Sequence, residues 1–407
     1  MSLHTLMFGW EYPPVHCGGL GVACQGIVRG LKAHGMHVTL VLPHDSASED
    51  GVSILTPSDL GVAGLISVQT RLHPYDSVET FAARIAAQEA DPALQELYGT
   101  DLGEAVERFT ASAVELTKNV PADIVHTHDW MTLGAGVRAA KALRKPLVAH
   151  VHATELDRTE FHPNAWIYAQ ELKGLQAADH VLAVSSYTKN LLVREYGIRA
   201  DKITVLHNGA FATPAHNRPI EKHGKRHPLV LFLGRLTVQK GVTYFLRAAR
   251  KIADHRSDVR FVIAGDGYLL PQLIAQSCEM GLADKVIFAG RVSNAEARQL
   301  YRKADCFVMP SVSEPFGLVA LEAITHGAPV VMSRQSGAAE VIQNSLLVDF
   351  WDTDKMADCI LTVLREEPLR HAMHSQTPRI LRNLTWERQA GKIMATYRNV
   401  IGGRGSN

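Results

Sequence analysis

The sequence predicts an α/β protein of two domains, each built on a parallel β-sheet. Short runs of β-branched and other apolar residues alternate with longer segments of helical periodicity, which is the pattern of βαβ units. The alternation occurs twice, and the polar, proline-containing stretch Thr213–His227 separates the two series. A chain of 407 residues is also long for one hydrophobic core. We therefore expect domains at residues 1–212 and 228–383, joined by a linker at 213–227.

The two series predict the positions of the strands. In the first domain we expect strands at His4–Phe8, His37–Leu42, Ile124–His126, Leu147–Val151, His180–Ala183 and Ile203–Leu206. In the second we expect them at Leu229–Phe232, Arg260–Ile263, Lys285–Phe288, Cys306–Met309 and Pro329–Met332. Helices lie between the strands, for example Leu20–His34 and Ala165–Ala177, and a last helix is expected at Trp386–Tyr397. Because open parallel sheets bind ligands beyond the carboxyl ends of their strands, the residues after these strands are the candidates for a site.

The composition argues against several classes of protein. The 42 Lys and Arg residues nearly balance the 41 Asp and Glu residues, so a net charge of +1 gives no field that favours nucleic acid or an acidic membrane. No apolar run approaches the roughly 18 residues of a membrane span, and the N-terminus lacks a secretion-signal pattern, so we expect a cytoplasmic protein without an integral membrane segment. The five cysteines are odd in number and scattered, which favours free thiols in a reducing compartment.

A glycine-containing loop follows the first strand of each domain. In the first domain Gly18 and Gly19 precede a helix, whose N-terminal amides favour an anion, although a plain structural turn is an equally good interpretation. In the second domain Arg235 and Lys240 lie in the loop Gly234–Gly241. A guanidinium and an ammonium in one loop are suited to a diphosphate, while the alternative is solvated surface charge.

A third candidate loop, Pro310–Gly317, comes later in the second domain. Its Pro-Phe-Gly turn would present backbone amides at the start of a helix, where phosphate oxygens bind. Glu314 precedes this helix and Glu322 lies inside it. Carboxylates suit hydroxyl groups, so a sugar and a ribose on either side of a diphosphate are their natural partners. The alternative makes Glu314 an exposed loop residue and Glu322 a solvated helix residue.

The sequence gives no indication of a metal or cofactor. No Asp-x-Asp motif follows a strand at the expected site, and we interpret Asp352-Thr353-Asp354, which lies near the C-terminal helices, as a helix cap or turn. We therefore expect no metal site, because Arg, Lys and helix N-termini would replace the cation.

At this point the motifs resemble a known family. Glu314 and Glu322 flank seven residues, matching the Glu-x7-Glu motif of the retaining GT-B glycosyltransferases of family GT4 (glycosyl transferases group 1), near the bacterial and archaeal glycogen and starch synthases. Further segments occur in the family's order: the Gly-Gly loop, Asp123–Trp130, Gly234–Lys240, Ser313–Glu322 and Gly337–Glu340. The resemblance implies two Rossmann-like domains facing each other across a cleft, with a C-terminal helix at about 384–400 that returns to the N-terminal domain.

The resemblance also implies roles for individual residues. As catalytic residues it implies Arg235 and Lys240 at the donor diphosphate, Glu314 at the hydroxyls of the donor sugar, and His152 close to the reacting sugar. His150 lies two residues earlier on the same side of its strand, and a core histidine is the alternative for either. The implied donor-binding residues are Gly18, Gly19, Arg291, Val292, Phe316, Gly317, Leu318 and Glu322. The implied acceptor-side residues are Glu11, His128, Asp129 and Asn208.

The implied activity is retaining transfer of a hexose, with glucose the expected sugar, from an ADP-, UDP- or GDP-sugar. An α-1,4-glucan is the favoured acceptor. The loop reads His16-Cys17-Gly18-Gly19, however, without the lysine that glycogen synthases carry two positions before the glycines. A lipid, a sugar phosphate or another small alcohol therefore stays open as acceptor, and the residues do not specify an oligomeric state.

Other classes share parts of this pattern. A nucleotide-sugar epimerase would change a free nucleotide sugar without any acceptor. A non-catalytic nucleotide-sugar sensor would keep the phosphate loop while losing His152 or Glu314, and both are present. A glycan phosphorylase would need a pyridoxal-bearing lysine context that we do not find, and a dehydrogenase is disfavoured because Gly265-Asp266-Gly267 lacks the remaining glycine of a dinucleotide fingerprint.

Overall fold

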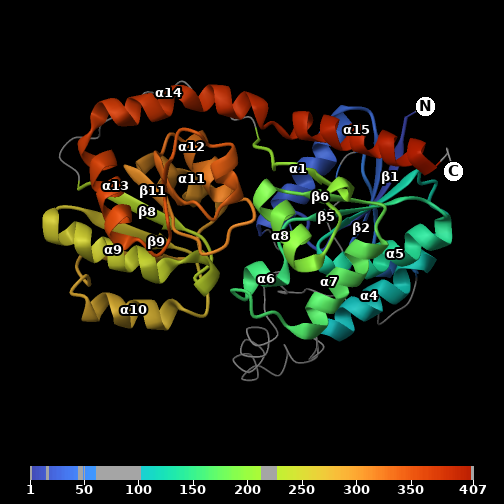
Figure 1. The fold of residues 1–407 in the computed structure, drawn as a ribbon, viewed down its shortest axis with the longest axis horizontal. Coiled ribbons are helices and arrows are strands. Elements are labelled where there is room, and N and C mark those ends of the chain that lie inside the picture. The colour runs from blue at the N-terminus through green and yellow to red at the C-terminus, as the bar shows by residue number, and fades with distance from the viewer. Residues whose placement is uncertain are drawn as a thin grey trace. The chain divides into compact units, whose positions relative to one another are not determined.

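The chain forms two compact α/β units in a computed structural model that describes residues 2–14, 18–44, 49, 51–60, 102–211 and 227–404 (Figure 1). The first unit comprises Met1–Gly209 together with Thr385–Asn407, and the second comprises Ala210–Leu384. The expected linker at 213–227 lies outside the described residues, apart from His227. Among the helices of the described part of the chain, none has the length and apolar character needed to cross a membrane.

The first unit is built on a seven-stranded sheet in the order β3-β2-β1-β4-β5-β6-β7. All of its strand pairs are parallel. The strands are β1 His4–Phe8, β2 His37–Val41, β3 Ser53–Leu55, β4 Ile124–His128, β5 Leu147–Val151, β6 His180–Ala183 and β7 Ile203–Val205. Its helices are α1 Gly19–Ala33, η1 Pro57–Leu60, α4 Leu102–Thr117, α5 Trp130–Leu143, α6 Glu155–Arg158, α7 Ala165–Ala177, α8 Ser186–Tyr196, η2 Ala200–Lys202 and α15 Trp386–Arg404.

The second unit is built on a six-stranded parallel sheet in the order β10-β9-β8-β11-β12-β13. Its strands are β8 Leu229–Leu233, β9 Arg260–Ala264, β10 Val286–Gly290, β11 Cys306–Met309, β12 Val330–Ser333 and β13 Leu346–Val348. Its helices are η4 Val238–Lys240, α9 Val242–His255, α10 Leu270–Glu279, α11 Asn294–Lys303, α12 Leu318–Thr325, η5 Gly337–Glu340, α13 Thr353–Arg365 and α14 Glu367–Asn383.

The structure corrects the predicted strands in two ways. The strand predicted to end at His126 continues to His128, because the polar residues Thr127 and His128 are buried and themselves pair with Ala149 and His150 of β5. The short edge strands Ser53–Leu55 and Leu346–Val348 were not predicted, since three residues carry too little periodicity to be recognised. The other predicted strands are present, with ends that agree with the prediction or differ from it by at most two residues.

The C-terminal helix belongs to the first unit, as the fold class predicted. Helix α15 packs against α1 (Figure 1), and the contact is close because α1 carries glycines on that face. A Cβ atom at Gly26 would lie 2.2 Å from Cε2 of Trp386, the first residue of α15. The hydroxyl of Tyr397, further along α15, is hydrogen-bonded to Nδ1 of His126 in β4. This helix therefore covers the face of the sheet onto which His126 projects.

Both sheets reverse their strand order beside their first strand. In the first unit the reversal lies between β1 and β4, and in the second between β8 and β11. Such switch points are where open α/β sheets bind ligands. Candidate ligand-binding residues were predicted from the sequence in the loops that follow these four strands. The interpretation of Asp352 as a helix cap is also confirmed, because its carboxylate accepts the Lys355 amide at the start of α13, at 2.9 Å.

Candidate functional site

Two loops of the second unit, Gly234–Gly241 after β8 and Pro310–Gly317 after β11, are hydrogen-bonded to each other at the switch point between these strands. The Val312 amide donates to the carbonyl of Gln239 at 2.9 Å, and the Gln239 side chain donates to the carbonyl of Ser313 at 3.1 Å. Gly241 is required where the loops touch, because its φ is +67° and a Cβ there would lie 1.9 Å from the carbonyl oxygen of Pro310. Residues far apart in the sequence are thereby held as one surface.

Lys240 and Glu314 form an ion pair on this surface. The Lys240 Nζ atom lies 2.7 Å from Glu314 Oε2, and that oxygen also accepts the Ser311 hydroxyl at 3.1 Å. Glu314 is only 6% exposed, so its alternative interpretation as an exposed loop residue is wrong. Arg235, half-buried on the same loop, donates from Nη2 to Gln239 Oε1 at 3.2 Å. The structure therefore brings together three of the four expected catalytic side chains.

The Pro-Phe-Gly turn is hydrogen-bonded to the start of η5. The Phe316 carbonyl accepts the Ala338 amide at 2.6 Å and the Ser336 hydroxyl at 3.1 Å. Gly317 precedes Leu318, the first residue of α12, and no side chain caps this helix. The first amides of α12 are thus suited to an anionic ligand beside the Lys240–Glu314 pair.

The remaining donor-side candidates of the second unit lie on α12 and after β10. Glu322, on α12, is half-buried and accepts the hydroxyl of Tyr301 from α11 at 3.0 Å. Burial raises the pKa of Glu322, so the solvated helix residue of the alternative interpretation is not what the structure contains. Arg291 is exposed and Val292 half-buried, and both follow β10 at the sheet edge, two strands from β8.

In the first unit, the carboxylate of Glu11 occupies the amides at the Gly-Gly turn. Glu11 follows β1, is 1% exposed, and accepts the amides of Gly18 at 3.1 Å and Gly21 at 3.3 Å through one carboxylate oxygen. Its carboxylate therefore caps the N-terminus of α1, which begins at Gly19. The sequence suggested an anion at this helix, and the structure shows a protein carboxylate there.

His152, which follows β5, is paired with His128, the last residue of the neighbouring strand β4. The His128 Nδ1 and His152 Nε2 atoms are 2.9 Å apart. Asp129 holds the segment that carries His152, because its Oδ1 accepts the amides of His152 at 2.6 Å and Ala153 at 3.3 Å. Asp129 has φ +57°, an uncommon backbone conformation for a non-glycine residue. The acceptor-side candidates His128 and Asp129 thus position the predicted catalytic histidine.

The protonation states follow from burial. Burial lowers the pKa of His128 to about 3, and burial with neighbouring histidines lowers the pKa of His152 well below its ordinary value. Burial raises the pKa of Asp129 to about 6, although the Arg158 guanidinium opposes this shift. At neutral pH His152 is therefore a neutral imidazole, which can exchange hydrogen bonds with a sugar hydroxyl but cannot act as a cation.

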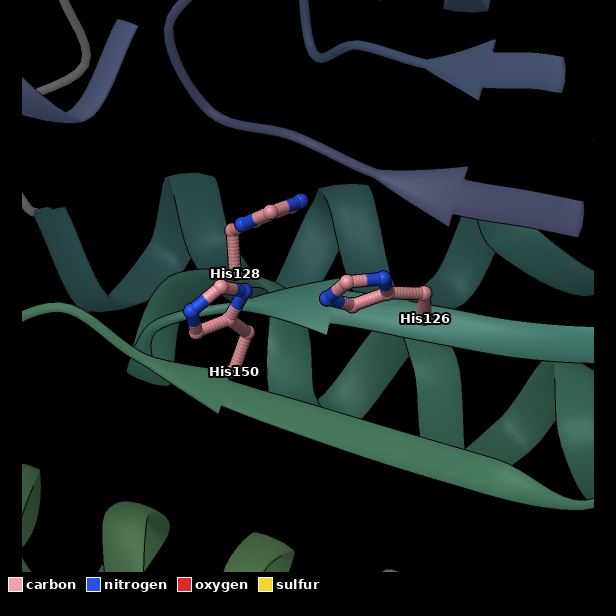
Figure 2. A group of neighbouring side chains, drawn as sticks. All are labelled: His126, His128 and His150. Atoms are coloured by element: carbon pink, nitrogen blue, oxygen red, sulfur yellow. The ribbon is translucent and has the colours of Figure 1, made fainter. Parts of the chain in front are cut away.

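Two further histidines complete a buried group that the sequence did not predict as a unit. His126, His128, His150 and His152 are all buried, and we call them the imidazole cluster. Neighbouring ring centroids in the cluster lie 4.3–5.5 Å apart. Figure 2 shows three of these side chains projecting from β4 and β5. The signal was the repeated His-x-His spacing, which places both histidines of a strand on one face.

A buried ionic cluster also escaped sequence reasoning. The Arg158 guanidinium lies 3.4 Å from Glu171, 3.7 Å from Asp129 and 3.8 Å from Glu155, and its side chain is 1% exposed. The Tyr196 hydroxyl donates to Glu171, whose pKa burial raises to about 8. The Arg158 guanidinium is thus held in the core by three acidic side chains. No local motif predicts this cluster, because its members come from α6, α7, α8 and the loop after β4.

Asn208 is the last of the acceptor-side candidates. It follows β7 and is 5% exposed, and within the described part of the chain its side-chain oxygen has no hydrogen-bond partner. Gly209 then passes against Trp386 of α15, since a Cβ there would lie 2.7 Å from the Trp386 ring.

Comparisons with known proteins agree with this arrangement in both halves of the chain. The family model described as Glycosyltransferase Family 4 matches residues 17–213, and the one described as Glycosyl transferases group 1 matches residues 215–379. An uncharacterised glycosyltransferase of Methanocaldococcus jannaschii is 28% identical over 96% of this chain and 97% of its own. A glycogen synthase of Mycobacterium tuberculosis is 29% identical over 84% and 80%.

Solved structures show the same fold. A sucrose-phosphate synthase from Thermosynechococcus elongatus superposes with a TM-score of 0.76 at 18% identity, covering 98% of this chain and 100% of its own. The HepE protein of Anabaena, solved in complex with UDP-glucose, gives a TM-score of 0.69 at 19% identity, covering 97% and 100%. With two Rossmann-like units, a returning C-terminal helix and family matches over both units, the chain belongs to glycosyltransferase family 4 and is a hexosyltransferase with the GT-B fold.

Proposed function

We propose that this enzyme transfers glucose from a nucleotide diphosphate sugar to a hydroxyl group of a neutral glycan, with retention of the anomeric configuration and without a metal ion. The observation that carries the donor side is the Lys240–Glu314 pair, 2.7 Å apart, beside Arg235 and the uncapped start of α12. Two cations and helix amides suit a diphosphate, and a carboxylate next to them suits sugar hydroxyls.

Each group has a part in the proposed reaction. The bond between the anomeric carbon and the diphosphate oxygen breaks, and the departing oxygen gains negative charge, which Arg235, Lys240 and the Leu318 amide stabilise. Glu314 accepts hydrogen bonds from the donor sugar and holds its orientation. The acceptor oxygen attacks from the face of the leaving group and passes its proton to the departing phosphate oxygen. Attack from this face gives retention and needs no enzyme nucleophile.

Glucose as the sugar is supported by the related protein that was solved with UDP-glucose. The base of the donor is not specified by the described residues. The enzyme should therefore be offered ADP-, UDP- and GDP-glucose in parallel.

A neutral acceptor is supported by the charges at the switch point of the first unit. The side chains after β1 and β4 are the carboxylates of Glu11 and Asp129, and the nearby histidines are neutral. The cation held in this region of the described chain, Arg158, is buried among three carboxylates. Among the described residues of this region, a phosphate on the acceptor would lie near these carboxylates. This charge pattern favours a glucan over a sugar phosphate, in line with the name of the mycobacterial relative.

The test is a matrix of donors and acceptors. Each nucleotide glucose is incubated with glycogen, maltoheptaose, inositol 1-phosphate or glucose 6-phosphate, with and without EDTA, and the released nucleoside diphosphate is measured. We expect release with one donor, dependent on the neutral glucan and unaffected by EDTA, and an α-linked product by NMR. Transfer to a phosphorylated acceptor alone, loss of activity in EDTA that magnesium restores, or a β-linked product would each overturn the corresponding part of the proposal.

The same matrix tests the alternative class. A nucleotide-sugar epimerase would convert the donor in the absence of any acceptor, so chromatography of the nucleotide sugar after incubation alone distinguishes the two activities.

A further inference from the structure

The imidazole cluster contains more ring nitrogens than hydrogen-bond partners. Buried nitrogens without a partner in the described part of the chain are Nε2 of His126, Nε2 of His128, both ring nitrogens of His150 and Nδ1 of His152. Burying a polar atom without a hydrogen-bond partner costs free energy, so a cluster of such atoms in one core calls for an occupant.

Three of the four rings gather around one point. His126, His128 and His150 each offer one nitrogen, and these atoms all lie within 4.8 Å of one another. They come from β4 and β5, which pair in register at His128 and His150. In Figure 2 the His126 ring is directed along β4 toward the end of the strand, where the side chains of His128 and His150 lie. A tetrahedral ion bound at about 2.0–2.1 Å needs nitrogens roughly 3.4 Å apart, so the rings would close inward on binding.

Contacts around the rings fit this occupant. His126 Nδ1 is hydrogen-bonded to the Tyr397 hydroxyl, and His128 Nδ1 lies 2.9 Å from His152 Nε2. Each of these rings therefore has one nitrogen held by a neighbour and Nε2 without a partner. Histidines that bind metals are arranged in this way, with the second nitrogen fixed by a hydrogen bond that sets the ring orientation.

We propose that His126, His128 and His150 bind one divalent transition-metal ion, Zn²⁺ by its ligand chemistry, as a structural site between β4 and β5 of the first unit. Neutral imidazoles suit Zn²⁺, whereas Mg²⁺ and Ca²⁺ take oxygen ligands. A water molecule would fill the fourth position. Through Tyr397 the bound ion would also strengthen the attachment of α15 to the sheet, so it should raise the stability of the folded chain.

The test uses untagged, full-length protein that has been dialysed against EDTA and then freed of chelator. Zn²⁺ is titrated in competition with a chromophoric chelator, and Co²⁺ is used as a spectroscopic probe. We expect one equivalent of Zn²⁺ to bind, a higher melting temperature with Zn²⁺, and visible Co²⁺ absorption typical of a tetrahedral site. His126→Gln and His150→Gln should each weaken binding at least 10-fold.

Matched controls separate this site from adventitious histidine binding. His255→Gln and His371→Gln remove exposed histidines of the second unit and should bind Zn²⁺ like the wild type. Circular dichroism reports whether the two cluster variants fold. Absence of Zn²⁺ binding by the wild type, or unchanged binding in a folded His150→Gln variant, would overturn the proposal. If neither cluster variant folds, the Co²⁺ spectrum of the wild type decides, and a spectrum of octahedral Co²⁺ would overturn it.

Discussion

Replacing Lys240 by methionine should reduce both the rate of transfer and the stability of the second unit, for two separable reasons. The substitution removes the ammonium that lies 2.7 Å from Glu314, and among the described side chains it leaves that carboxylate with the Ser311 hydroxyl as its hydrogen-bond donor, at 3.1 Å. Breaking a fully buried pair costs about 3–5 kcal/mol. Because the Lys240 side chain is 18% exposed, solvent screening lowers our expectation to about 2 kcal/mol.

The rate should fall more than the stability suggests. Removing one group that stabilises developing charge typically lowers kcat by about 10²–10³, and we expect this for Lys240→Met with the donor identified by the matrix. In Lys240→Met/Glu314→Gln the unpaired buried charge is gone, so stability should return to within about 1 kcal/mol of the wild type. Activity should not return, because both groups at the donor are missing. Initial rates and chemical denaturation followed by circular dichroism measure the two effects.

A surface ion pair provides the control for this reasoning. Lys251 pairs with Asp354, but these side chains are 36% and 83% exposed. Lys251→Met should therefore change stability by less than about 1 kcal/mol and leave the rate unchanged. The assigned role of Lys240 would be refuted if Lys240→Met kept transfer within threefold of the wild type. If the double variant were as unstable as the single one, the loss of stability would not come from the unpaired Glu314 charge.

Three further predictions concern the first unit. Gly26→Ala places a Cβ 2.2 Å from the Trp386 ring and should lower the free energy of unfolding by about 1–3 kcal/mol, measured by thermal or chemical denaturation. The control Gly402→Ala, which has open space around it, should be neutral or slightly stabilising. Equal effects of the two substitutions would contradict the close packing of α15 on α1. Burial raises the folded-state pKa of Glu171 to about 8 from 4.5, so the folded chain keeps a proton that the unfolded chain releases, and stability is lost as the pH rises through this interval. Glu171→Gln should therefore gain stability relative to the wild type by up to about 1.4 kcal/mol per pH unit between pH 6 and pH 8, and parallel stability curves would show that the group does not titrate there. Glu11→Gln removes the charge that caps α1 and should lower the free energy of unfolding by about 0.5–1 kcal/mol. It should also raise the rate of transfer to phosphorylated acceptors relative to the rate with neutral acceptors. If this ratio of rates is unchanged, Glu11 has no part in acceptor selection.

Much of the fold was accessible from local pattern. Parallel strands buried on both faces are continuous apolar runs, and Leu147–Val151 and Cys306–Met309 were predicted with the ends that the structure shows. Prediction failed where pattern and burial disagree. In β4, Thr127 is buried against Gly136 of α5, while α15, which is far away in the sequence, covers the opposite face at His126. The edge strands are too short to carry a period.

The sequence by itself determined the two α/β units, the family and the loops that carry the candidate donor residues, because strand periodicity, glycine loops and the spacing of Glu314 and Glu322 are local features of the chain. Only the tertiary structure decided which side chains meet. It paired Lys240 with Glu314, set the Glu11 carboxylate on α1, and gathered four neutral histidines on one face of the sheet. Contacts of this kind join segments far apart in the chain, such as His126 and Tyr397, which are 271 residues apart, and the chain specifies them through packing and burial rather than through any short pattern.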